Sequence, residues 1–249
     1  MKKIIATIVA SVGILTAFAE TSANNNAGGL AQEIKYPWES RAALGLTLTQ
    51  GNSDTLMVTA AVSTQKKTPV NEFSVGVGAA YGKSDSVKNA ESYNAFGQMN
   101  HLFSERMFGY VRADYLHDGV ADLRYRVTLS LGAGYYLIKA TNTTLAVEAG
   151  PGVVFRDLGG VHETFATLRL AERFEHKFGS GARVWQTLEF LPQVDKWRNY
   201  IINAEVGGEA ALAKDLSLQV VLCDTYNSLP AAGRKNNDLK LVSGIAYKF

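Results

Sequence analysis

The stretch LKLVSGIAYKF, residues 239–249, alternates apolar side chains with mostly small or charged ones. Successive side chains in a strand point to opposite faces, so this pattern predicts a strand with one apolar face. That face carries Leu239, Leu241, Ile245, Tyr247 and Phe249. A strand that finishes on an aromatic residue is typical of the closing strand of a bacterial outer-membrane β-barrel. We therefore interpret Gly244, Tyr247 and Phe249 as a signal that the barrel-assembly machinery would read during insertion.

The N-terminal residues support export to the outer membrane. Lys2 and Lys3 form a basic segment, residues 4–15 are mostly apolar, and Ala17 and Ala19 precede a cleavage site. We expect residues 1–19 to be a signal peptide, with cleavage after Ala23 as the alternative. The apolar run is shorter than the roughly 20 residues of a membrane-spanning helix. Residues 20–36 then form a polar periplasmic leader, and residues 37–249 form the barrel.

Composition excludes several classes of function. Without Lys2 and Lys3 the chain has 23 basic and 23 acidic residues, which gives no basic tract for nucleic acid. Cys223 is the only cysteine, so neither an internal disulfide nor a cysteine-based zinc site is expected. The four histidines lack metal-ligand spacing, and no glycine-rich loop is complete. We therefore expect no metal and no cofactor.

Period-two alternation runs through the rest of the chain. Residues 124–137 place Tyr125, Leu129 and Leu131 on one face, and Arg126, Thr128 and Ser130 on the other. One face suits lipid and the other suits water, which predicts an all-β fold: a transmembrane antiparallel up-and-down barrel of about 12 strands. A soluble two-layer β protein is the alternative. The strands are expected at residues 38–50, 55–66, 72–82, 91–103, 107–118, 123–138, 143–156, 163–178, 182–192, 199–212, 215–226 and 238–249.

The expected lengths of the connections agree with a barrel, whereas two segments do not suit a regular strand. If both termini face the periplasm, the periplasmic turns are short and most outer loops are longer, among them 83–90, 157–162 and 193–198. Residues 164–177 have a composition that favours helix, and a strand there would place Glu172 on the lipid face. Pro151 would lie inside a strand, where it lacks an amide donor, although Gly150 and Gly152 suit a kink or bulge.

Several motifs resemble a known family. Trp38-Glu39, Leu44-Gly45 and Gly51-Asn52-Ser53 are similar to the opening hairpin of the YdiY-like family, described as salt-induced outer membrane proteins and classed as a domain of unknown function. The central strands add Tyr125-Arg126, Gly132-Ala-Gly134-Tyr135-Tyr136 and Glu148-Ala-Gly150-Pro151-Gly152. The resemblance covers most of residues 38–249. It implies a barrel in the outer membrane and a link to salt or osmotic stress, but no reaction and no catalytic residues.

The inward face is where chemistry is expected, because the alternation places charges of both signs there. Long side chains of opposite charge either fill so narrow a lumen or line a wet path through it. We expect a mostly filled lumen in a non-enzymatic envelope component, with a small passive channel for ions or small solutes as the alternative. The candidate lumen residues are Arg41, Arg112, Asp114, Arg124, Arg126, Glu148, Arg169, Arg173, Glu189 and Glu205.

A hydrolytic enzyme of the outer membrane is a further alternative. A lipase-type site could use His101 near Ser104, or His162 near Thr164. A protease-type site could draw on rim residues, namely Asp114, His117 and Asp118, or Asp157 and His162. Loops usually carry such residues for solubility, so we predict no enzyme activity. The expected protein is a monomer in the Gram-negative outer membrane, surrounded by lipid and lipopolysaccharide.

Overall fold

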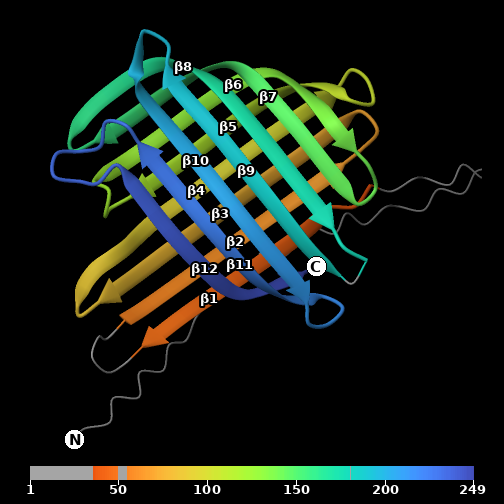
Figure 1. The fold of residues 1–249 in the computed structure, drawn as a ribbon, viewed down its shortest axis with the longest axis horizontal. Coiled ribbons are helices and arrows are strands. Elements are labelled where there is room, and N and C mark those ends of the chain that lie inside the picture. Colours follow the sequence, from red (N-terminus) through yellow and green to blue (C-terminus); the bar gives the residue numbers. More distant parts are fainter. Residues whose placement is uncertain (1–35, 50–54, 180) are drawn as a thin grey trace, which may run out of the picture. The chain divides into compact units, whose positions relative to one another are not determined.

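The computed structural model describes residues 36–49, 55–179 and 181–249. The predicted signal peptide, 1–19, and residues 20–35 of the predicted leader lie outside the described residues. The described residues form a closed antiparallel barrel of twelve strands, which confirms the predicted fold class (Figure 1). The strands are β1 (Glu39–Thr49), β2 (Thr55–Lys67), β3 (Asn71–Ser84), β4 (Val87–Leu102), β5 (Met107–Asp118), β6 (Leu123–Lys139), β7 (Thr143–Leu158), β8 (Val161–Lys177), β9 (Ala182–Gln193), β10 (Lys196–Ala211), β11 (Leu216–Asn227) and β12 (Asn237–Lys248).

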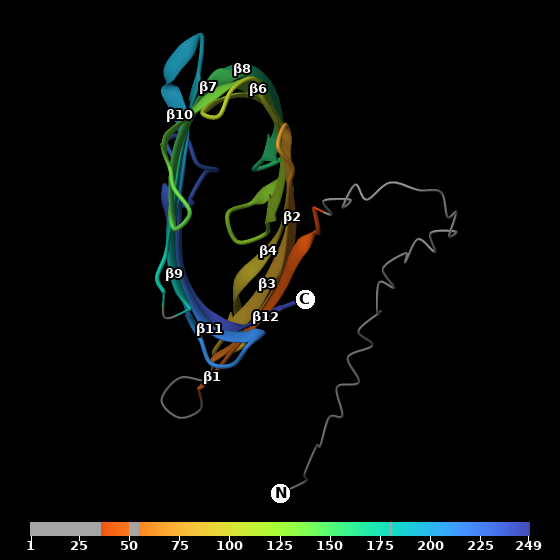
Figure 2. The same cartoon turned by 90° about the vertical axis from the view of Figure 1, so that its right-hand side faces the viewer.

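Each strand pairs with its neighbours in the sequence, and β12 closes the ring by pairing with β1. The backbones of Ser40 and Phe249 exchange two hydrogen bonds, of 3.2 and 3.0 Å, where β1 begins and β12 ends. We call this end of the barrel the terminal end and the opposite one the distal end. The strands cross the barrel obliquely in Figure 1, and Figure 2 shows them forming one continuous wall.

The two faces of the wall follow the period-two pattern. On β6, Thr128 and Ser130 are 3% exposed and point into the barrel, whereas Leu131 is 60% exposed and points outward. An apolar outer surface of this kind suits hydrocarbon, and closure of the barrel lets strand amides pair within the wall. None of the described residues forms a helix that is long and apolar enough to cross a membrane.

The two segments that resisted the prediction both lie in regular strands. Residues 164–177 belong to β8, which pairs with β7 along its whole length, so tertiary pairing outweighs helix propensity here. Pro151 lies in the interior of β7 opposite Leu168. Next to it the backbones of β6 and β7 approach so closely that a Cβ on Gly150 would lie 2.0 Å from the carbonyl oxygen of Leu131. Only glycine fits this close approach.

The expectation of longer outer loops is wrong for most distal connections. Two-residue turns at 85–86, 159–160 and 194–195 replace the expected loops 83–90, 157–162 and 193–198, because the strand pairs continue further. Asp85 and Ser86, like Gly159 and Gly160, have positive φ angles, between 49° and 79°. Positive φ at both central residues is the requirement of the tight turn that best matches the twist of a hairpin. Of the described connections, 228–236 is the longest.

Candidate functional site: the barrel lumen

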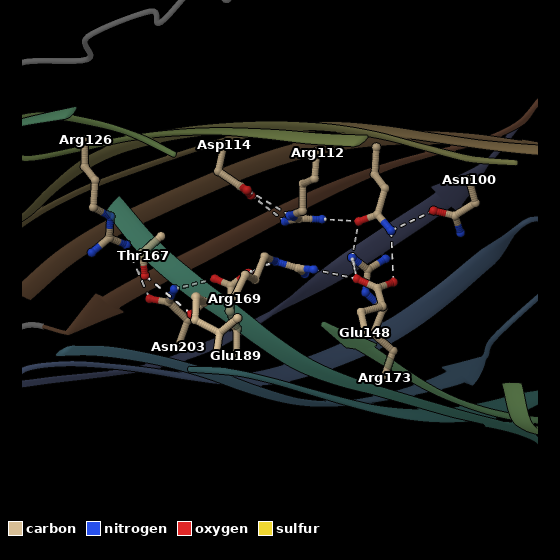
Figure 3. A network of polar contacts seen from close by, with 12 residues as sticks. Asn100, Arg112, Asp114, Arg126, Glu148, Thr167, Arg169, Arg173, Glu189 and Asn203 are labelled. Carbon is tan, nitrogen blue, oxygen red and sulfur yellow. Dashed lines mark hydrogen bonds and ion pairs between the residues drawn. The ribbon is translucent and has the colours of Figure 1, made fainter. Parts of the chain in front are cut away.

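A buried ion-pair network occupies the middle of the lumen, with Arg169 of β8 at its centre (Figure 3). Its guanidinium donates to Glu148 of β7 at 2.7 Å and to Glu189 of β9 at 2.6 Å. The side chains of Arg169 and Glu148 are 2% and 1% exposed. The Arg169 guanidinium also lies over the Tyr110 ring, 5.1 Å from its centroid. Two carboxylates and an aromatic face therefore replace water around one buried cation.

Gln98 of β4 connects this core to the other side of the ring. Its amide nitrogen donates to Glu148 at 2.9 Å and to Asn100 at 2.8 Å. Its amide oxygen accepts hydrogen bonds from Arg112 of β5, at 3.1 Å, and from Arg173 of β8. Since three strands separate β4 from β8 in the ring, the contact between Gln98 and Arg173 bridges the lumen rather than following the wall.

The network extends toward the distal end through further polar side chains. Arg112 binds both carboxylate oxygens of Asp114, at 2.8 and 2.5 Å. Asn203 of β10 donates to Glu189 at 2.8 Å and accepts from Arg126 of β6 at 3.3 Å. Seven of the sequence-predicted lumen residues are thereby brought together: Arg112, Asp114, Arg126, Glu148, Arg169, Arg173 and Glu189.

Two of the other predicted residues lie nearer the terminal end. Arg41 of β1 forms an ion pair with Glu209 of β10, which also accepts from Arg183 of β9 at 2.8 Å. Glu205 of β10 accepts from the Trp185 indole nitrogen at 2.6 Å. The Trp185 ring in turn lies under the Arg183 guanidinium, 4.3 Å from ring centroid to Cζ. This second cluster ties β1, β9 and β10 together where the barrel closes.

Arg124 and Lys240 lie toward the distal end. Arg124 is 72% exposed and pairs with Asp157 at 3.1 Å, so it belongs to the distal rim and not to the lumen network. Lys240 of β12 reaches across the lumen to Asp118 of β5, at 2.7 Å.

Sequence reasoning missed several members of the lumen. Glu72, Gln98, Asn100, Glu175, Arg183 and Asn203 all take part in lumen contacts. The available signal was strand parity: Gln98 and Asn100 alternate in phase with the small lumen residue Asn94. Their partners were not predictable in this way, because these partners lie on strands that are distant along the ring.

The lumen wall is unevenly packed. Thr128, Ser130, Glu148, Val154, Thr167 and Arg169, which we call the packed wall, are each at most 4% exposed. The first four strands, β1–β4, differ from this packed wall. They carry small lumen-facing side chains that are partly or fully exposed. This open wall consists of Ala43, Thr59, Ala61, Ser63, Gly78, Ala80 and Asn94. The charge network therefore fills one side of the lumen and leaves the other side accessible to water.

Among the described residues, the histidines of the hydrolytic alternatives contact groups other than a serine or threonine hydroxyl. No group of three or more His, Cys, Asp or Glu side chains in the described part of the chain could hold a metal ion. The ring nitrogens of His101 and His117 contact Asn71 and a backbone carbonyl, and His162 lies near Tyr125 and Asp157. Thr143 and His176 share a hydrogen bond of 2.7 Å, but no carboxylate in the described part of the chain orients that histidine.

A closed twelve-stranded wall with an apolar exterior and a charged interior defines an outer-membrane, porin-like β-barrel. Residues 42–249 match the family described as "Protein of unknown function, DUF481", and the chain belongs to this family. The resemblance to a domain family of unknown function is thereby confirmed.

Two solved porin structures are similar to this chain at low sequence identity. The NanC porin is similar with a TM-score of 0.52 at 5% identity, over 85% of this chain and 100% of that chain. The KdgM porin in complex with disordered oligogalacturonate has a TM-score of 0.48 at 10% identity, over 84% and 99% of the two chains. No curated protein matches the chain.

Proposed function

We propose that this protein is a narrow passive diffusion channel that prefers small anions, with a path along the open wall. The uneven packing of the lumen carries this proposal. A channel needs a continuous strip of small, wettable side chains, and Ala61, Ser63 and Asn94 supply exposed positions of that kind. The packed wall then serves as a rigid charged support. The likeness to a porin in fold is consistent with this role.

The proposed preference for anions rests on three ion pairs in which the cation faces water more than the carboxylate does. Lys240 is 34% exposed and Asp118 9%. Arg173 is 30% exposed and Glu148 1%. Arg41 is 24% exposed and Glu209 12%. Three pairs, spread from the distal to the terminal end, thus present the cation to the lumen. The carboxylate is the more exposed partner in the pairs Arg112–Asp114, with 15% against 25%, Arg169–Glu189, with 2% against 16%, and Arg183–Glu175, with 20% against 28%, and also in Arg156–Glu163 at the distal end, with 2% against 42%. Where Lys240, Arg173 and Arg41 line the path, they lower the barrier for anions more than for cations.

Planar-bilayer recordings with a potassium chloride gradient test the proposal. We expect small, steady conductance and a reversal potential that is shifted from zero toward the equilibrium potential of chloride. Lys240→Gln should move the reversal potential toward the equilibrium potential of potassium. Lys214→Gln removes the same charge from the turn at 212–215, outside the lumen, and should leave it unchanged. Absence of conductance, or selectivity for potassium, would overturn the proposal.

A sealed envelope component is the second candidate, because the central network alone could block the lumen. Gln98 contacts both walls through Arg173 and Glu148, which supports this alternative. Insulating bilayers, recorded with protein that shows heat-modifiable mobility and is therefore folded, would favour it over the channel.

The proposed route to the membrane is export with removal of residues 1–19, followed by insertion through the barrel-assembly machinery. The mass of the mature protein from outer membranes tests the cleavage site. A mature chain beginning at Glu20 supports the proposal, one beginning at Asn24 supports the alternative after Ala23, and retention of Lys2 and Lys3 contradicts both.

A further inference from the structure

The outward face of β5–β9 carries two polar side chains at mid-height, Glu172 of β8 and Gln186 of β9. Their outward neighbours along the same strands are apolar, for example Leu170, Leu188 and Phe190. Neither Glu172 nor Gln186 forms a side-chain hydrogen bond or ion pair with another of the described residues. A carboxyl group and an amide that face hydrocarbon without a partner are unfavourable, so polar groups at this depth mark sites of function.

The register of the strands gives the height of Glu172. A continuous row of paired residues crosses eight strands, and it runs through Met107, Tyr135, Val147, Glu172, Leu188, Ala204, Asp224 and Leu239. The row begins at the terminal end, where Met107 opens β5, and finishes near the distal end, where Leu239 is the third residue of β12. Glu172 is the fourth of the eight. It therefore lies near mid-height of the apolar outer face.

Gln186 lies at nearly the same height as Glu172. The partner of Glu172 in the row is Leu188 on the next strand, β9. Gln186 is two residues nearer the terminal end than Leu188 and pairs with Phe174. With strands about 4.8 Å apart and tilted by about 40°, the first step raises Gln186 by about 3 Å and the second lowers it by about 5 Å. The two groups form a pair at one depth, and no hydrogen bond joins them within the described chain.

A groove adjoins Glu172 on the same face. Its volume is about 500 Å³, and its lining includes the small side chains of Ala133 and Ala149 between the larger ones of Tyr135, Leu170 and Phe190. Small residues that let two surfaces approach closely are the usual feature of protein contacts inside membranes, where the hydrophobic effect does not drive association.

We propose that this face binds a second copy of the same chain, with Glu172 of each copy paired to Gln186 of the other. In a two-fold dimer whose axis runs along the membrane normal, a contact from the first residue to the second is repeated in reverse. Because Glu172 and Gln186 lie at nearly equal height, the same contact between them forms twice in the dimer, once from each copy. A carboxyl oxygen accepts from the amide N–H, and the carboxyl group, when protonated, donates to the amide oxygen. This dimer replaces the monomer that the sequence suggested, and it does not depend on whether the lumen conducts.

Cysteine cross-linking in native outer membranes tests the dimer with the full chain in a Cys223→Ser background. Phe174→Cys lies between the two polar residues and should form disulfide-linked dimers of twice the monomer mass. Val75→Cys, which faces outward from β3, is the control and should stay monomeric. The added changes Glu172→Leu and Gln186→Leu together should reduce cross-linking at least fivefold, whereas Asp224→Leu, on the same row, should not.

The mass of the wild-type protein extracted in native lipid discs provides a second measurement that needs no variant. We expect two chains per disc. A single chain, cross-links of Phe174→Cys to a protein of another mass, or equal cross-linking from Val75→Cys would each overturn the proposal. Heat-modifiable mobility of every variant shows that the barrel has folded.

Discussion

Arg169 and Glu148 are held 2.7 Å apart on neighbouring strands, and both side chains are almost completely withdrawn from water. Burial of two charges is costly, and their attraction offsets that cost only because further groups complete their hydrogen bonds. Glu189 and Gln98 supply those bonds. The pair therefore stabilises the barrel as part of a network, and removal of one partner leaves an uncompensated charge.

Glu148→Ala should destabilise the barrel strongly, because it leaves both Arg169 and Arg173 without this carboxylate. The expected loss is about 3–5 kcal/mol, the usual effect of breaking a buried ion pair. Urea unfolding in lipid vesicles, followed by tryptophan fluorescence, measures it. Glu175→Ala is the control, since Glu175 is 28% exposed and should cost about 1 kcal/mol or less. Equal losses in the two variants would contradict the central role of Glu148.

Ser63→Cys and Ser130→Cys should differ sharply in reactivity, since both point into the lumen but only Ser63 lies on the open wall. Ser130 is 3% exposed. In a Cys223→Ser background, a small charged thiol reagent should modify Ser63→Cys at least tenfold faster than Ser130→Cys. Because the two substitutions are identical in chemistry, comparable rates would show that the lumen is evenly packed.

Much of the fold follows from the sequence, because strand parity is a local property. The run from Leu123 to Lys139 assigns inward and outward faces without any knowledge of neighbouring strands. The alternation also predicted an inward direction for seven charged residues, and the structure joins these seven in one network. The lengths of the distal hairpins did not follow, because a strand pair can continue past the membrane wherever Asp85-Ser86 or Gly159-Gly160 closes a tight turn.

Partners across the lumen were beyond sequence reasoning for a different physical reason. The contact of Gln98 with Arg173 depends on the diameter and stagger of the closed barrel, which only the full set of registers defines. The same holds for Glu172. Its outward direction is evident from parity, but its height and its relation to Gln186 come from a row of pairs across eight strands.

Gly244→Val should weaken closure of the barrel. A Cβ at Gly244 would lie 2.2 Å from the Leu44 carbonyl oxygen, where β12 and β1 are paired over only four residue pairs. The backbone cannot move away from such a clash without loss of those hydrogen bonds. We expect a lower temperature of conversion to the unfolded band on unheated gels. Gly97→Val, where an added Cβ meets nothing within 4 Å, is the matched control and should leave that temperature unchanged.

Two arginines on β8 should separate stability from ion selectivity. Arg169→Gln removes the cation that pairs with both Glu148 and Glu189, so a loss of about 3–5 kcal/mol in unfolding free energy is expected. Arg173 is 30% exposed, and Glu148 still pairs with Arg169 when Arg173 is replaced. Arg173→Gln should therefore lower the unfolding free energy by about 1 kcal/mol or less. The same variant should move the reversal potential in a salt gradient toward the equilibrium potential of the cation. Urea unfolding and bilayer recording of both variants check the two halves. If Arg173→Gln left the reversal potential unchanged, the lumen cations would not set selectivity, and the charge network would be structural throughout.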